Sequence, residues 1–184
     1  MEFQDLIKKQ LSEKRYQHSL RVAQTAVSLA RVHGVDCGKA EMAGLLHDFC
    51  KEYAKADLVR IAVDEKLLTS REDLLMPQVL HGPVAAVVLK AEGLCDDEEI
   101  LQAVRYHTTG HPDMGELAKI IFIADYIEPG RKTPHIDDLY DIAVQSLDRC
   151  IVEIIDRTAV YLMRERKIIH EDMIRLRNKI LSEE

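Results

Sequence analysis

The sequence feature that most constrains the fold is a set of histidine and aspartate side chains at apolar, helix-periodic positions. The stretch Ala43-Gly-Leu-Leu-His-Asp48 shows the feature most clearly, because two metal-type ligands directly follow leucines that are expected in the core. Four more such residues each lie on or at the end of another apolar segment: His18, His81, His107 and Asp125. Burying four imidazoles without partners is costly. A fold that brings all six side chains to one metal centre removes that cost.

Apolar residues recur with a helical period in nearly every segment, and no stretch alternates convincingly as a half-buried strand would. The pattern predicts an all-α fold. The predicted helices cover about 3–11, 16–33, 36–48, 55–66, 83–89, 96–107, 117–125 and 137 to the end, with a break near 168–169. Periodicity alone leaves open whether 139–166 is one helix or two.

The length and composition fit one domain that works without a nucleic acid or a membrane. A chain of 184 residues with 47% hydrophobic residues can bury a sizeable core. The formal charge of −7 disfavours a nucleic-acid or anionic-lipid surface, and no apolar run approaches the roughly 20 residues that span a bilayer. Four isolated cysteines without a CxxC pair, and a start without an apolar leader, indicate a reducing cytoplasm.

A single histidine on a helix is more often a cap or a satisfied core group than a metal ligand. That interpretation is adequate for His33, at a predicted helix C-terminus, and for His135, in a Pro-flanked loop. It does not account for His47, Asp48 and Asp125 taken together. Imidazoles and carboxylates without thiolate suit Fe, Mn, Co or Zn and argue against a structural zinc site built on cysteine. A catalytic metal also needs open positions for water and substrate.

Longer motifs extend this pattern. The chain contains His107-Thr-Thr-Gly110, then Lys119-Ile-Ile-Phe-Ile-Ala-Asp-Tyr-Ile-Glu-Pro-Gly-Arg131, and Leu45-Leu-His-Asp48 followed by Lys51. With the order His18, His47-Asp48, Asp125, it resembles the HD-domain metal-dependent phosphohydrolases. Within them it resembles the YqeK-type symmetrical bis(5′-nucleosyl)-tetraphosphatases, over about Tyr16 to Leu181. The His-Asp doublet alone is a weak indicator, whereas the segment that ends at Arg131, together with His107-Thr-Thr-Gly110, is specific.

The resemblance implies a single HD-type helical bundle over 1–184, with a core of about 16–130, C-terminal helices 137–184 packing on it, and a metal centre inside. It implies an iron-type cation held by His18, His47, Asp48 and Asp125. It also implies hydrolysis of diadenosine tetraphosphate and related dinucleoside polyphosphates at the central bridge, which releases two ADP.

The resemblance further implies that a nucleoside diphosphate lies across the metal and that the stretch from His170 closes over the base. The implied substrate contacts are His18, Arg21, Asp48, Lys51, His81, His107, Thr108, Thr109, Gly110, Asp125, Arg131 and His170. His111 departs from the family pattern, in which Arg is more usual, so a weaker contact with anions is expected there.

Residue chemistry suggests catalytic roles for Asp48, His81 and His107. Asp48 is expected to bind the metal and to orient the attacking water. His81 and His107 are expected either to protonate or clamp the leaving phosphate, or to hold a second metal. Without the resemblance, Arg21, Lys51 and Arg131 would be interpreted as solvated surface charges. Residues 108–110 would then be interpreted as a helix-ending turn.

Two other functions fit the same residues. One is an HD-type hydrolase with a mononucleotide or a (p)ppGpp-like substrate, and the other is a non-catalytic module that anchors a nucleotide through its metal. The expected partners are a dinucleoside polyphosphate substrate and its ADP product. Apolar positions on the last helices would also permit a homodimer.

Overall fold

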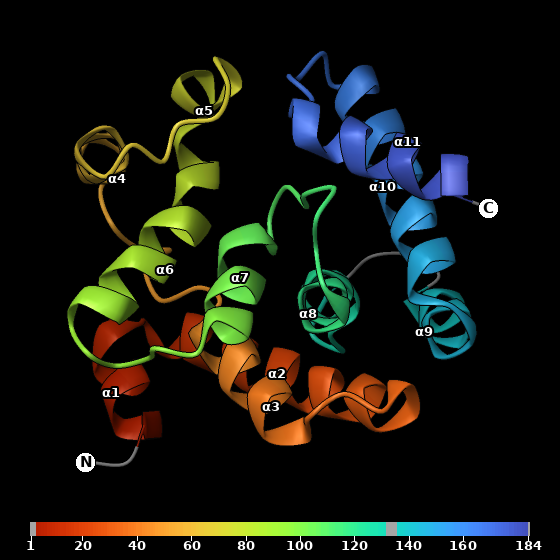
Figure 1. Ribbon diagram of the computed structural model, residues 1–184, viewed down its shortest axis with the longest axis horizontal. Coiled ribbons are helices and arrows are strands. Elements are labelled where there is room, and N and C mark those ends of the chain that lie inside the picture. The colour runs from red at the N-terminus through yellow and green to blue at the C-terminus, as the bar shows by residue number, and fades with distance from the viewer. Residues whose placement is uncertain (1–2, 132–135, 184) are drawn as a thin grey trace.

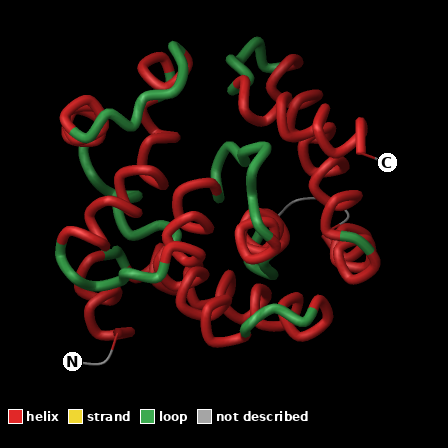
Figure 2. Tube along the Cα trace, viewed as in Figure 1, coloured by secondary structure: helices red, strands yellow, loops and turns green. Residues whose placement is uncertain are grey.

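The computed structural model describes residues 3–131 and 136–183, and every regular element within them is a helix (Figure 1, Figure 2). The all-helical, single-domain fold expected from the sequence is confirmed. The elements are α1 (Phe3–Gln10), α2 (Glu13–His33), α3 (Cys37–Leu46), α4 (Lys55–Asp64), α5 (Glu72–Leu75), the 3₁₀ helix η1 (Pro77–Leu80), α6 (His81–Ala91), α7 (Glu98–Tyr106), α8 (Glu116–Ile127), α9 (Ile136–Gln145), α10 (Leu147–Arg164) and α11 (Glu171–Glu183). No helix among these is both long enough and apolar enough to cross a membrane.

The helices α2 and α3 form a closely packed pair along one side of the molecule (Figure 1). Small residues let their backbones approach, since a Cβ atom on Gly44 would lie only 2.6 Å from the Cα atom of Ala23. The glycine is therefore required by the neighbouring backbone. This close contact sets the spacing between His18 on α2 and His47 after α3.

Helix α8 carries Asp125 into the middle of the fold. Nearly all its apolar side chains are buried: Leu117, Ala118, Ile120, Ile121, Phe122, Ile123, Ala124 and Ile127. It contacts α2, α3, α7, α9 and α10, and Figure 1 shows it end-on between α7 and the C-terminal helices. A helix that is apolar on nearly every face is typical of a buried position. The carboxylate of Asp125, near the end of this helix, therefore needs partners.

Several helix boundaries differ from the expectation by a few residues, and the structure also resolves the stretch that periodicity leaves open. Helix α3 ends at Leu46 rather than at Asp48, and His47 is its C-cap. The stretch 139–166 lies in two helices, because Ser146 adopts an extended backbone (φ −160°, ψ 118°) and its hydroxyl accepts the Arg149 N–H at 3.2 Å. A capping serine that starts a new helix is a strong local signal.

Replacing Gly44 with alanine tests how closely α2 and α3 must approach. The added methyl would also lie 2.9 Å from Ala23 N, so the helices must separate, although alanine favours a helix over glycine by about 1 kcal/mol. We expect Gly44→Ala to lower the free energy of unfolding by about 1–3 kcal/mol, measured by urea denaturation. Gly115→Ala, with open space around the new methyl, should change it by less than about 1 kcal/mol. Equal losses in the two variants would contradict the close-approach argument.

Candidate metal centre

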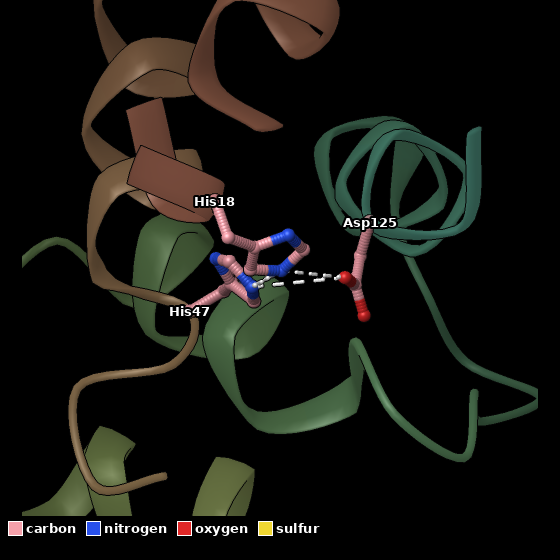
Figure 3. A group of neighbouring side chains, drawn as sticks. All are labelled: His18, His47 and Asp125. Carbon is pink, nitrogen blue, oxygen red and sulfur yellow. Dashed lines mark hydrogen bonds and ion pairs between the residues drawn. The ribbon is translucent and has the colours of Figure 1, made fainter. Parts of the chain in front are cut away.

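His18, His47, Asp48 and Asp125, from three parts of the chain, meet at one point between α2, α3 and α8. Figure 3 shows three of them, His18, His47 and Asp125. His18 Nε2 lies 3.0 Å from Asp125 Oδ1 and 3.3 Å from His47 Nε2. His47 Nε2 lies 3.3 Å from Asp48 Oδ2. The structure thus brings together the four residues that the sequence proposed as metal ligands.

His81 and His107 lie on the other side of Asp48. His81 Nε2 is 3.0 Å from Asp48 Oδ1 and 2.9 Å from His107 Nε2. His107 Nε2 is 3.6 Å from the same oxygen. Asp48 therefore lies between two pairs of imidazoles and turns one carboxylate oxygen to each pair, and all four histidines were predicted site residues.

Three of the four histidines are oriented by the same kind of hydrogen bond to the backbone. The Nδ1 atom of each lies 2.6–2.7 Å from the backbone carbonyl oxygen three residues earlier, in the pairs His47–Gly44, His81–Gln78 and His107–Val104. Each histidine follows the last residue of a helix, where free carbonyls need donors. Because a carbonyl only accepts, Nδ1 carries the hydrogen and Nε2 of the neutral ring keeps its lone pair.

His18 also carries its hydrogen on Nδ1, but its acceptor is a side chain instead of a backbone carbonyl. It lies inside α2, and its Nδ1 faces Glu128 Oε1 at 3.1 Å. Since an ionised carboxylate also only accepts, His18 Nε2 presents a lone pair as well. Four such lone pairs face one another and the oxygens of Asp48 and Asp125. They repel one another unless a positive charge lies between them.

The carboxylates are held ionised. Burial alone would raise the pKa of Asp48, but the neighbouring His47 and His107 hold that pKa well below its usual range. Burial likewise opposes ionisation of Asp125, yet His18, His47 and a nearby arginine lower its pKa. Both ligands therefore carry full negative charge near neutral pH.

The two central imidazoles respond differently to the same surroundings. Burial lowers the pKa of His47, but the charges of Asp48 and Asp125 outweigh it and raise that pKa above its ordinary value. Burial lowers the pKa of His107 to about 4. The two carboxylates thus attract positive charge to the His47 ring itself, whereas His107 is a neutral lone-pair donor at pH 7.

One atom indicates directly that the residues fit a cation. Asp48 Oδ1 is buried and finds no hydrogen bond of acceptable geometry within the described part of the chain, although His81 Nε2 is close. An ionised oxygen without a donor is costly in a protein interior. Carboxylates and neutral imidazoles are common ligands of divalent transition metals, so the cluster is suited to hold a divalent metal ion.

Basic side chains surround the cluster, and some were expected from the sequence. Lys51 Nζ lies 3.1 Å from His81 Nε2 and 3.5 Å from Asp48 Oδ1. Arg131 donates from Nε to the Asp125 carbonyl at 2.9 Å, and its Nη2 contacts the Asp125 carboxylate. These two cations thus reach the ligands themselves.

Two contacts of the cluster were missed in the sequence. Arg15 Nη1 donates to Asp48 Oδ2 at 2.7 Å. Its spacing of three residues from His18 was the available signal, because i, i+3 residues share a helix face. Glu128 binds Arg21, with Nε to Oε2 at 2.5 Å, so Arg21 reaches the centre through this carboxylate. Glu128 lies within the motif that carried the family resemblance, but only the tertiary contacts reveal its partners.

The loop after α7 connects the centre to two cavities. Thr108 Oγ1 is 3.0 Å from His107 Nε2. One cavity is lined by His107, Thr108, Phe122, Asp125, Tyr126, Arg131, Ile154, Thr158 and Met173. The other is lined by residues that include Tyr106, Thr109, His111 and His170. Gly110, with φ 70°, packs beneath Leu176 of α11, where a Cβ atom would lie 2.5 Å from Cδ2.

His170 and two other described histidines, His111 and His33, lie apart from the cluster. His170 Nε2 is 3.1 Å from Asp73 Oδ1, and its Nδ1 accepts the Asp172 N–H at 3.2 Å. His111 stacks on Tyr106 with ring centroids 4.6 Å apart. His33 Nε2 donates to the Ala143 carbonyl at 2.8 Å. His135 lies outside the described residues.

Alanine variants of His47 and Asp48 test the ligand assignment. We expect each to lower the bound metal to less than about a tenth of the wild-type content, because a ligand of a shared site is lost. Elemental analysis of purified protein measures this. His33→Ala is the control, since His33 lies fifteen residues from His18 on α2, about 22 Å along the helix. Loss of metal in that variant, or full metal content in Asp48→Ala, would refute the assignment.

Comparisons with known proteins place this arrangement in a family. The family model described as HD domain matches residues 15–130. A Staphylococcus aureus protein named "Bis(5'-nucleosyl)-tetraphosphatase, symmetrical" is 45% identical over 173 residues, covering 92% of this chain and 88% of the relative. A Bacillus subtilis protein of the same name is 38% identical over 176 residues, covering 96% of this chain and 94% of the relative.

A solved structure is similar along the whole chain. It is described as a predicted HD superfamily hydrolase involved in NAD metabolism from Clostridium acetobutylicum. The TM-score is 0.94 with 37% sequence identity, covering 98% of this chain and 96% of that one. The resemblance found in the sequence motifs is confirmed over most of the chain: it belongs to the HD-domain family, and within it to the relatives of the symmetrical bis(5′-nucleosyl)-tetraphosphatases.

Proposed function

We propose that this protein hydrolyses diadenosine tetraphosphate and related dinucleoside polyphosphates at the central phosphoanhydride bridge, with two ADP as products. The observation that carries the proposal is the meeting of His18, His47, Asp48 and Asp125 at one point, with basic side chains at its edge. The names of the relatives, which match nearly the whole chain, support the same reaction.

The proposed cofactor is a divalent transition metal held by His18, His47, Asp48 and Asp125. We propose iron, with Mn, Co and Zn as the alternatives. When bound, such a cation neutralises phosphoryl oxygens and lowers the pKa of a water. We also propose that His81 and His107 can hold a second ion, because Asp48 turns its other carboxylate oxygen, Oδ1, to both rings. The pKa of about 4 supports this role for His107 over proton donation at pH 7.

The surrounding residues have proposed roles that follow from their contacts. Asp48, with an oxygen that lacks a hydrogen-bond donor, is placed to orient the attacking water. His81 and His107 contact the leaving phosphate if no second ion is present. Lys51 and Arg131 hold the polyphosphate by charge, since both already contact carboxylate oxygens at the centre. The further proposed substrate contacts are His18, Arg21, Thr108, Thr109, Gly110, Asp125 and His170.

The domain organisation, the cellular compartment and the oligomeric state of this protein are also proposals. Residues 16–130 form the catalytic core and 137–184 pack on it, in agreement with the contacts of α10 with α8. The four cysteines Cys37, Cys50, Cys95 and Cys150 are unpaired, as expected in the cytoplasm. Exposed apolar side chains on α10, among them Tyr161 and Met163, are compatible with a homodimer.

Chromatography of the products of a diadenosine tetraphosphate digest tests the reaction. The metal-loaded protein should yield ADP alone, because the cut falls at the bridge equidistant from the two nucleosides. Metal-depleted protein should lose at least about 100-fold in rate and recover when the ion is restored. ATP and AMP in equal amounts would refute the symmetrical cut.

A nucleotide panel separates the two alternatives. A mononucleotide or a (p)ppGpp-like compound that is hydrolysed faster than diadenosine tetraphosphate at equal concentration would assign a different substrate. Tight binding of ADP by iron-loaded protein without turnover of any nucleotide would identify a non-catalytic binding module.

A further inference from the structure

One buried carboxylate, Glu128, is not a proposed metal ligand but contacts both the ligand His18 and the neighbouring Arg21. Glu128 caps the C-terminus of α8, and its side chain is only 2% exposed. It accepts from His18 Nδ1 at 3.1 Å, from Arg21 Nε at 2.5 Å, from Arg21 Nη2 at 3.3 Å and from the Gly130 N–H at 2.5 Å. These donors keep its pKa below the ordinary value against the effect of burial.

His18 needs this carboxylate because of where it lies in the chain. Each of the other three histidines directly follows the last residue of a helix, so a backbone carbonyl of that preceding helix orients its ring. His18 lies inside α2, where the carbonyls are used by the helix itself. An acceptor from another element must therefore hold its Nδ1–H, and Glu128 supplies it.

Packing around Glu128 keeps water away from this contact. The Arg21 guanidinium lies over Gly130, where a Cβ atom would be 2.5 Å from Nε. The turn at Gly130 and Arg21 thus enclose the carboxylate with His18. In a site of low dielectric constant, a charged acceptor on the far nitrogen makes the facing nitrogen a stronger base and fixes the ring.

We propose that Glu128 is a positioning residue of the metal centre: it fixes His18 with Nε2 toward the cation and holds Arg21 beside it. The proposal rests on the metal-binding part of the proposed function and is independent of the substrate. Each of the four histidines has one acceptor for its Nδ1 hydrogen, and Glu128 is the only one of these acceptors that is a side chain. A mutation at Glu128 therefore removes the hydrogen bond that orients His18 and leaves the histidine itself in place.

The test measures zinc affinity by chelator competition on metal-depleted protein, for wild type, Glu128→Gln and Glu128→Ala. Glutamine keeps an oxygen for His18 but loses the charge, whereas alanine loses both. We expect the zinc dissociation constant to rise about 10- to 100-fold in the alanine variant, with glutamine in between. Long-range nitrogen NMR of the zinc-loaded proteins should show His18 protonated at Nδ1 in wild type and in Glu128→Gln, and a changed ring state in Glu128→Ala.

A matched control separates positioning from loss of stability. Asp73 is also buried, also accepts from a histidine at 3.1 Å, and also accepts backbone N–H groups, from Thr69 and Ser70. Asp73→Ala should lower the melting temperature as Glu128→Ala does, but leave the zinc dissociation constant within about threefold of wild type. If Asp73→Ala weakens zinc as much as Glu128→Ala, the proposal is wrong.

Two further outcomes decide the matter. Folded Glu128→Ala protein that binds zinc within about threefold of wild type overturns the proposal. If the alanine variant does not fold, the glutamine variant decides, because an unchanged zinc dissociation constant in that variant also overturns the proposal. Failure of wild type to cleave diadenosine tetraphosphate would reject the proposed substrate and leave this comparison of affinities intact.

Discussion

Mutual repulsion among buried lone pairs is the constraint around which this structure is arranged. Four imidazole Nε2 atoms and the oxygens of Asp48 and Asp125 face one another in the interior. Such a group is unfavourable without a positive charge at its centre, and basic residues at its edge compensate only the periphery. A cation turns the same atoms into a binding site. Part of the stability of the fold is therefore expected to depend on the metal.

The backbone provides most of the orientation. His47, His81 and His107 each cap the helix that precedes them through Nδ1, so one hydrogen bond satisfies a free carbonyl and also turns Nε2 inward. A helix C-terminus is where the chain has unpaired acceptors. The local geometry that ends a helix thus also selects the tautomer that a metal requires.

Helix packing decides where these local units meet. The contact of Gly44 with Ala23 brings α3 close to α2, and the buried helix α8 brings Asp125 between them. The C-terminal helix packs on Gly110, three residues after His107. The two cavities beside this loop are lined by residues from the middle and the last third of the chain, and one of them includes His107 and Asp125.

The sequence alone determined the helical class, most helix positions and the six residues that meet at the centre, because helical periodicity and buried polar residues are local signals. It could not place the end of α3 at Leu46, nor divide 139–166 at Ser146, since capping depends on small backbone differences. Only the tertiary structure revealed Arg15 at Asp48, Glu128 at His18 and Asp73 at His170. These pairs join residues 33 to 110 positions apart, and such pairings depend on how helices cross rather than on any pattern within one of them.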